Sequence, residues 1–179
     1  MKRDAGRQAP TRFDALKLAE RGESIAGAVE TSRLPRLADR AVRPSDAEEA
    51  RIEWSIAGGR DVQGCPALTV ALAGQIFVSC QRCLRPLAVA VSQQTELLLA
   101  RSEAELARLD ADEQEVILAS APLDALTLIE DELLLSLPFA PCHEKDACVA
   151  AATPIVAPQV APSPFAPLAG LKTGSRSRN

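Results

Sequence analysis

Aromatic residues are scarce in this chain: its 179 residues include four Phe, one Trp and no Tyr. Apolar residues still make up 47% of the sequence, which is ample for a core packed mainly through Ala, Leu and Val. The bases of single-stranded nucleic acid commonly stack on aromatic side chains. The composition therefore argues against a single-strand binder of that kind.

Long apolar segments are also missing. No apolar run approaches the ~20 residues that a membrane span needs, and the N-terminal run MKRDAGRQ leads into no apolar stretch of a secretory signal. Five cysteines, an odd number, then indicate reduced thiols or metal ligands rather than a disulfide framework. We therefore expect a cytoplasmic protein that does not contact a membrane.

Recognisable catalytic patterns are absent as well. The sequence contains no phosphate-binding loop, no paired-carboxylate signature and no nucleophile–base set. Any chemistry would have to pass through the cysteines. Apart from the cysteines, the sequence gives no sign of an enzyme or of a small-molecule substrate.

Charge is distributed unevenly along the chain. Residues 1–44 carry ten Lys/Arg against six Asp/Glu, residues 45–137 carry six against sixteen, and residues 138–179 carry four against two. An acidic body repels a phosphate backbone, whereas basic ends can contact RNA and the body can meet a basic partner.

The pattern of apolar residues predicts one α+β domain over residues 13–148. A disordered basic N-terminus (1–12) precedes it, and a Pro/Ala-rich tail (149–179) with a terminal Phe/Leu/Lys motif follows it. Alternation of apolar residues predicts strands at 24–29, 51–57, 66–80, 87–100 and 115–119, with a turn at 58–61 and a hairpin tip at 80–86. We expect an antiparallel sheet or a small, partly open barrel packed against one acidic, leucine-rich helix, with flexible tails.

That helix is predicted to begin near Asp124, an acceptable N-cap, and to end before Pro138. Glu130 falls in the middle of its main apolar face. A buried carboxylate must pair or accept hydrogen bonds, because burying it alone is costly. Two interpretations are open: an ion pair with an arginine such as Arg82 or Arg85, or a functional site residue.

Two groups of cysteines flank this helix in the sequence. Cys80 and Cys83 form a Cys-x-x-Cys turn, and the segment CHEKDAC at 142–148 contains the only histidine. Zinc prefers four nitrogen or sulfur ligands, and a Cys-x-x-Cys turn supplies two. The second pair would be Cys148 with either Cys142 or His143.

Two other interpretations of these cysteines are open: a metal-free pair of reduced thiols, and thiol redox chemistry. The redox interpretation is disfavoured, because reactive Cys-x-x-Cys motifs commonly lie at a helix N-terminus and here a strand precedes the motif. Cys65, which stands alone, is interpreted as an ordinary buried cysteine.

Four motifs in order resemble the bacterial YceD family, the large ribosomal RNA subunit accumulation proteins. They are CQRCLRP at 80–86, IEDELLLSLP at 129–138, His143 with Cys148, and PFAPLAGLK at 164–172. The resemblance implies a non-enzymatic cytoplasmic factor that is required for accumulation of 23S ribosomal RNA. It also suggests Cys80, Cys83, His143 and Cys148 as the ligand set for zinc.

The expected partners are 23S ribosomal RNA or its precursor, or a ribosomal protein of the large subunit. Arg82 and Arg85 flank a rigid turn from which they can reach phosphates. The other candidate contact residues are Glu130, Phe165 and Lys172. The alternative functions are a Cys-x-x-Cys thiol redox protein and a metal-dependent, protein-binding adaptor.

Overall fold

The computed structural model describes residues 11–44, 49–111, 115–144 and 147–148. The predicted Pro/Ala-rich tail, with Phe165 and Lys172, lies outside these residues, as does most of the predicted disordered N-terminus. The elements in chain order are β1 (Arg12–Phe13), α1 (Ala15–Arg21), β2 (Ser24–Glu30), η1 (Thr31–Arg33), α2 (Pro35–Ala38), β3 (Arg51–Arg60), β4 (Pro66–Ser79), β5 (Pro86–Ala100), α3 (Glu103–Asp110), β6 (Val116–Leu118), β7 (Leu123–Asp124) and α4 (Ala125–Ser136).

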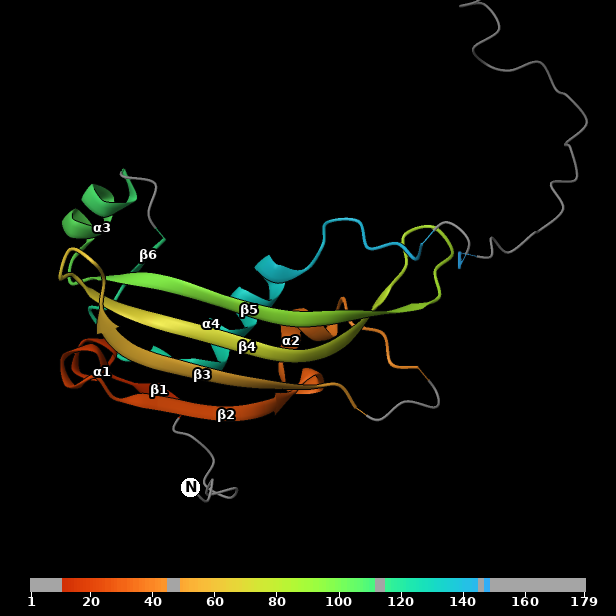
Figure 1. The fold of residues 1–179 in the computed structure, drawn as a ribbon, viewed down its shortest axis with the longest axis horizontal. Helices are drawn as coiled ribbons and strands as arrows, with labels where there is room; N and C mark the ends of the chain where they lie inside the picture. Colours follow the sequence, from red (N-terminus) through yellow and green to blue (C-terminus); the bar gives the residue numbers. More distant parts are fainter. Residues whose placement is uncertain (1–10, 45–48, 112–114, 145–146, 149–179) are drawn as a thin grey trace, which may run out of the picture. The chain divides into compact units, whose positions relative to one another are not determined.

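A five-stranded sheet in the order β2-β3-β4-β5-β6 forms the centre of the domain (Figure 1). The pairs from β2 to β5 are antiparallel, as predicted. The pairing of β5 with β6 is parallel, so the prediction of a purely antiparallel sheet is wrong. The chain reaches β6 through α3, and a helical crossover of this kind returns a strand parallel to its neighbour. The sheet is open and does not close into a barrel, and β1 pairs with β7 separately.

Strand β3 is longer than predicted. Ile52, Trp54 and Ile56 are buried, as their alternation indicates, but the predicted turn at 58–61 is wrong because the strand continues to Arg60. The turn lies at Asp61–Cys65 instead, where the Asp61 carboxylate accepts backbone N–H groups. Gly58 is required inside the strand, since a Cβ there would collide with the backbone of Leu18 in α1.

Three helices pack on one face of the sheet. Helices α1, α2 and α4 contribute to the main core, together with the inward residues of β3, β4 and β5. Helix α3 lies on the opposite face, where Leu109 joins a smaller cluster with Ala67, Leu98 and Ala100. In the described part of the chain, none of the helices combines the length and the hydropathy of a membrane span.

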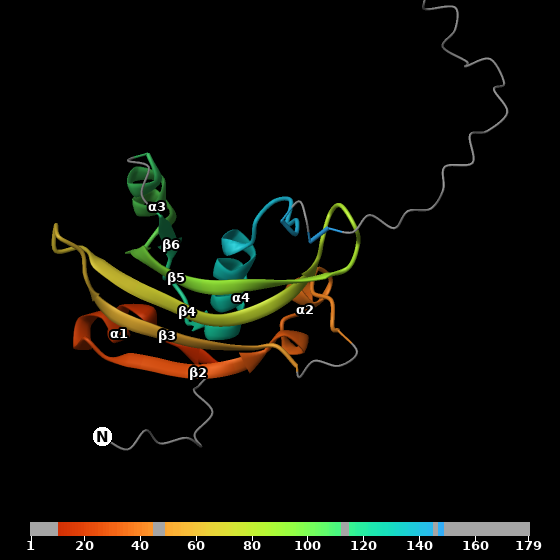
Figure 2. The same cartoon turned by 45° about the vertical axis from the view of Figure 1, so that its right-hand side comes forward.

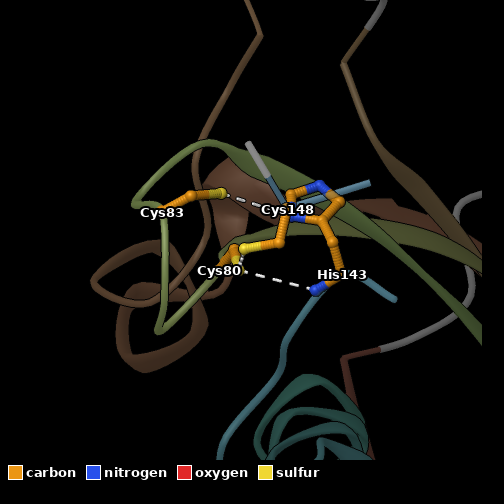
Figure 3. A group of neighbouring side chains, drawn as sticks. All are labelled: Cys80, Cys83, His143 and Cys148. Atoms are coloured by element: carbon orange, nitrogen blue, oxygen red, sulfur yellow. Dashed lines mark hydrogen bonds between the residues drawn. The ribbon is translucent and has the colours of Figure 1, made fainter. Parts of the chain in front are cut away.

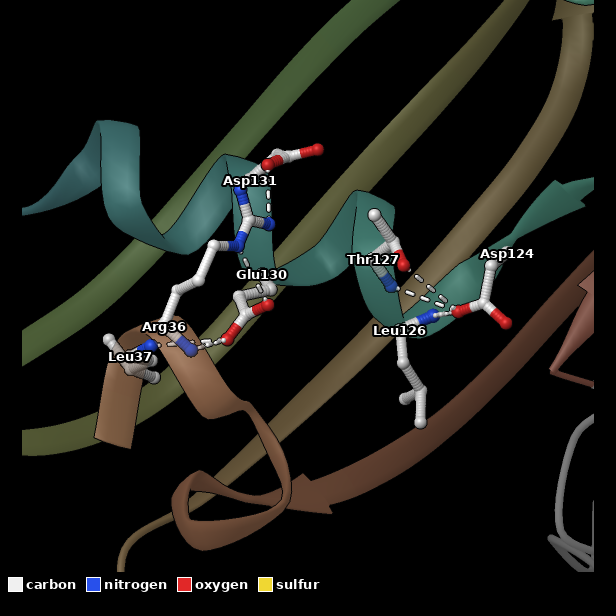
Figure 4. Close-up of polar contacts among 7 residues, drawn as sticks. All are labelled: Arg36, Leu37, Asp124, Leu126, Thr127, Glu130 and Asp131. Atoms are coloured by element: carbon white, nitrogen blue, oxygen red, sulfur yellow. Dashed lines mark hydrogen bonds and ion pairs between the residues drawn. The ribbon is translucent and has the colours of Figure 1, made fainter. Parts of the chain in front are cut away.

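Helix α4 occupies the predicted range between Asp124 and Pro138. The Asp124 carboxylate caps it by accepting the N–H groups of Leu126 and Thr127 at 3.0 Å each (Figure 4). Its buried residues are Ala125, Ile129, Glu130, Glu132 and Leu133. The helix crosses the sheet beneath β4 and β5, and its last turns extend beyond the β5 edge (Figures 1 and 2).

Candidate metal centre

The β4–β5 hairpin tip and the segment after α4 meet at one corner of the domain (Figure 3). Each of Cys80, Cys83, His143 and Cys148 offers one ligand atom there, and these atoms all lie within 4.8 Å of one another. The structure therefore brings together the four residues predicted as a ligand set. Cys142 is exposed and does not belong to this group, and Cys65 is only partly buried at the far end of β4.

Two of the distances between ligand atoms match those of a tetrahedral zinc ion. With Zn–S bonds of about 2.3 Å and Zn–N bonds of about 2.05 Å, tetrahedral geometry places two sulfurs about 3.8 Å apart and a sulfur and a nitrogen about 3.6 Å apart. Cys80 Sγ and Cys148 Sγ are 3.8 Å apart, and Cys83 Sγ and His143 Nδ1 are 3.5 Å apart. The donor set, three sulfurs and one imidazole, is one that zinc favours.

The second nitrogen of the His143 ring also has a hydrogen-bond partner. Its Nε2 lies 3.1 Å from the carbonyl oxygen of Pro86, which can only accept. A proton on Nε2 leaves the lone pair of Nδ1 directed at the three sulfurs. This carbonyl contact is the usual arrangement behind a metal-bound histidine, because it fixes both the tautomer and the ring orientation.

The surroundings of Cys80 favour its thiolate, whereas those of Cys148 favour its neutral thiol. Burial alone raises the pKa of Cys80, but N–H groups from the backbone of Cys83, Arg82 and His143 overcome it and lower the pKa to about 5. Burial and the neighbouring sulfurs raise the pKa of Cys148 to about 11. Three thiolates in one corner repel one another, and a divalent cation is what allows all three to ionise together.

The knuckle, which is the Cys-x-x-Cys turn at residues 80–86, is closed by backbone hydrogen bonds. Cys80 N–H donates to the carbonyl of Arg85, and Leu84 N–H donates to the carbonyl of Cys80, at 3.0 and 2.9 Å. Gln81 N–H donates to the carbonyl of Pro141 at 2.8 Å, which joins the tip to the segment after α4. Leu84 has a φ of 60°, in the left-handed region that L-residues rarely adopt.

Replacing Leu84 with glycine is expected to raise the free energy of unfolding by about 0.5–1 kcal/mol. The left-handed conformation costs a side chain about 1–2 kcal/mol, and the greater freedom of glycine in the unfolded chain offsets part of the gain. Urea denaturation measures the change. Leu84→Ala is the control, because it keeps the Cβ. An equal gain in both variants would assign the effect to loss of an exposed leucine, not to relief of strain.

The two arginines of the tip have different surroundings. Arg85 donates from Nη2 to the carbonyl of Ala147 at 3.1 Å, so it supports the corner that holds Cys148. Arg82 is exposed, and no ion pair involves its side chain within the described residues. Neither arginine pairs with Glu130. The predicted ion pair of Glu130 with an arginine is confirmed, but the arginine is Arg36 and not Arg82 or Arg85.

Glu130 instead caps helix α2 (Figure 4). Its Oε1 accepts the N–H groups of Arg36 and Leu37 at 2.7 and 3.1 Å, and its Oε2 accepts Nε of Arg36 at 3.0 Å. Arg36 also pairs with Asp131 at 2.6 Å. Burial raises the pKa of Glu130, but these hydrogen bonds outweigh it and hold the pKa below its ordinary value.

The sequence analysis did not identify Arg36 as the partner of Glu130, although the start of α2 gives an indication of it. Helix α2 begins with Pro35 after Leu34, which has no side chain able to cap it. A helix start without Ser, Thr, Asp or Asn leaves N–H groups that must be satisfied from elsewhere. A buried carboxylate without a local partner is a natural acceptor for them.

Comparison with known proteins adds one match. A family model described as large ribosomal RNA subunit accumulation protein YceD matches residues 68–172. This range contains the hairpin tip, α4 and all four candidate ligands. No solved structure matches the chain significantly.

Proposed function

The chain belongs to the YceD family of large ribosomal RNA subunit accumulation proteins, and on that basis we propose that it supports accumulation of 23S ribosomal RNA during assembly of the large subunit. The family match over 68–172 carries this proposal. The protein acts by binding, in the cytoplasm, and does not catalyse a reaction itself. Its partners are 23S ribosomal RNA or its precursor, or a protein of the large subunit.

A zinc ion bound by Cys80, Cys83, His143 and Cys148 would have a structural role. Four protein ligands complete a tetrahedral shell, whereas catalytic zinc sites keep one position open for water or substrate. The ion would fasten the hairpin tip to the segment that follows α4. Exposed Arg82 and Leu84 would then be presented on a rigid turn. This rigidity supports a binding role, because a preorganised surface loses less entropy on association.

The burial of Cys80 weighs against a thiol redox enzyme. Reactive cysteines occupy partially exposed positions, whereas the exposed fraction of Cys80 is 0%. The Cys-x-x-Cys motif also lies between two strands and not at a helix N-terminus, the usual position of reactive motifs; the N–H groups that lower the pKa of Cys80 come from the turn itself and from His143.

Deleting the gene is expected to lower the ratio of 23S to 16S ribosomal RNA, because large subunits that fail to assemble have their RNA degraded. The ratio is measured by electrophoresis of total RNA from exponentially growing cells. Complementation with the wild-type gene and with a Cys142→Ser variant should restore it, whereas Cys83→Ser should not. A ratio that the deletion leaves unchanged would contradict the proposed function.

A further inference from the structure

One edge of the sheet is mostly unpaired. Strand β5 pairs with β4 from Pro86 to Leu98, but on its other side it pairs with β6 only at Leu98–Ala100. Between Ala88 and Leu97, no strand among the described residues adjoins that side. Figure 1 shows this stretch of β5 at the rim of the sheet.

The alternation of the ladder identifies the backbone groups on the free side. The β4–β5 register is unbroken, and in an antiparallel strand every second residue directs its N–H and C=O away from the partner. Leu98 N–H donates to Glu115 on the β6 side at 2.8 Å, so even-numbered residues face outward. The unpaired groups therefore belong to Ala88, Ala90, Ser92, Gln94 and Glu96.

This edge has few of the features that usually prevent strand addition. Natural edge strands are blunted by lysines, prolines, bulges or short length. The stretch LAVAVSQQT at 87–95 contains no charge and no proline, and the ladder beside it has no bulge. An edge of this length is a template on which an extended peptide can form main-chain hydrogen bonds.

Helix α4 provides a surface beneath an added strand. Its last turns extend beyond β5 in both views (Figures 1 and 2), and Leu135 in the last turn is 77% exposed. A sixth strand beside β5 would lie over these turns and cover apolar surface that the described residues leave open. The exposed apolar surface favours binding of another segment, and only an extended segment can bond to the free backbone groups of β5.

The buried carboxylate of Glu132 near this edge indicates that a positively charged segment would bind there. Glu132 is 5% exposed, and its one hydrogen-bond partner among the described residues is the neutral amide of Gln93, at 3.2 Å. Gln93 lies on the helix side of β5. A strand paired with β5 would place a side chain directly beside Gln93, where a lysine or arginine can reach the Glu132 carboxylate. A buried carboxylate without a cation is costly, so a cation there would be favoured.

We propose that the β5 edge from Ala88 to Glu96 binds an extended basic segment of a partner protein as an added strand, with a lysine or arginine of that segment pairing with Glu132. This proposal deepens the proposed function, because it makes the direct partner a basic protein of the large subunit and not RNA. The net −10 charge of residues 45–137 favours such a segment over RNA.

The central test is Ser92→Pro, with Ser92→Ala as its matched control. Proline removes the outward N–H of Ser92 and keeps the ladder with β4, because the edge side of a strand tolerates it. A photoreactive amino acid at Gln94 in the full chain is exposed to total protein extracted from purified large subunits. We expect a crosslink to a lysine- or arginine-rich segment, unchanged by Ser92→Ala and reduced about tenfold or more by Ser92→Pro, which loses a hydrogen bond and gains a clash.

Two further measurements keep the test decisive if Ser92→Pro does not fold. Glu132→Gln should weaken the same crosslink about tenfold, as loss of one charge-assisted contact. Amide exchange of the wild-type chain should show the N–H groups of Ala88, Ala90, Ser92, Gln94 and Glu96 exchanging quickly when free and becoming protected in the complex. A crosslink that survives Ser92→Pro, a crosslink between two copies of the chain, or no crosslink would each overturn the proposal.

The outcomes also separate this proposal from the proposed function. If the gene deletion lowers the 23S to 16S ratio but Ser92→Pro restores it fully, the edge is not the partner site and the function stands. If the crosslink forms as described but the deletion leaves the ratio unchanged, the edge binds its segment and the role in 23S accumulation is wrong.

Discussion

Replacing Cys83 with serine is expected to reduce bound zinc from about one ion per chain to almost none. Serine offers a weak oxygen ligand in place of a thiolate, and zinc sites of this donor type depend on the full set. Structural zinc contributes about 10–16 kcal/mol of apparent binding free energy in small zinc-binding peptides, and binding at such sites is coupled to folding. The corner at Cys80, His143 and Cys148 should therefore loosen, and the melting temperature should fall.

Elemental analysis of protein purified without chelator measures the metal, and calorimetry measures the melting temperature. Cys142→Ser is the matched control. It changes a cysteine next to a ligand but outside the group of four, so it should keep both the zinc and the stability. Zinc absent from the wild-type chain, or retained in Cys83→Ser, would contradict the assignment of the site.

Replacing Glu130 with alanine is expected to lower the free energy of unfolding by about 3 kcal/mol. The substitution removes an acceptor of three hydrogen bonds, two of them from the backbone of Arg36 and Leu37. Hydrogen bonds to a charged group contribute about 1.5–3 kcal/mol, and a donor left buried without a partner costs about 1–3 kcal/mol. Urea denaturation at pH 7 measures the loss.

Asp131→Asn is the control for this experiment. Asp131 binds the same Arg36, but both side chains are about half exposed, and exposed ion pairs contribute less than about 1 kcal/mol. If Glu130→Ala costs no more than Asp131→Asn, the capping role of Glu130 is wrong.

The lowered pKa of Glu130 predicts that the free energy of unfolding depends on pH. The pKa of Glu130 is lowered in the folded chain, so its stabilisation is fully present above the unfolded-state pKa of about 4.3. It is lost as the pH falls through the lower folded-state value. Unfolding free energies measured from pH 7 down to pH 3 should therefore fall less steeply in Glu130→Gln than in the wild type.

Local patterns were sufficient to predict most of the strands. Alternation with a period of two identified β2, β4 and β5. Successive side chains of a strand point to opposite faces of the sheet, so a strand with one buried face shows the pattern within its own few residues. Cys80, directly after β4, continues the buried even-numbered positions of that strand and is itself buried. The same reasoning failed at Gly58, where glycine normally indicates a turn and here permits close approach of α1.

Contacts between distant segments could not be predicted in this way. Glu130 and Arg36 are 94 positions apart, and no local pattern links a cap to a helix so far away. At the candidate metal centre, spacing alone allowed either Cys142 or His143 as the fourth ligand. The path of the chain after α4 decides between them, because Gln81 binds Pro141 and the ring of His143 is held between Cys83 and Pro86.

The sixty residues that separate Cys83 from His143 have a consequence during synthesis. The β4–β5 hairpin pairs residues close in sequence, from Ser79 with Pro86 outward, so it can form as soon as it leaves the ribosome. At about 5–20 residues per second, the two knuckle thiols wait roughly 3–12 s for their imidazole partner. A nascent chain therefore presents two of the four candidate ligands before the domain is complete, and only translation past α4 completes the candidate set.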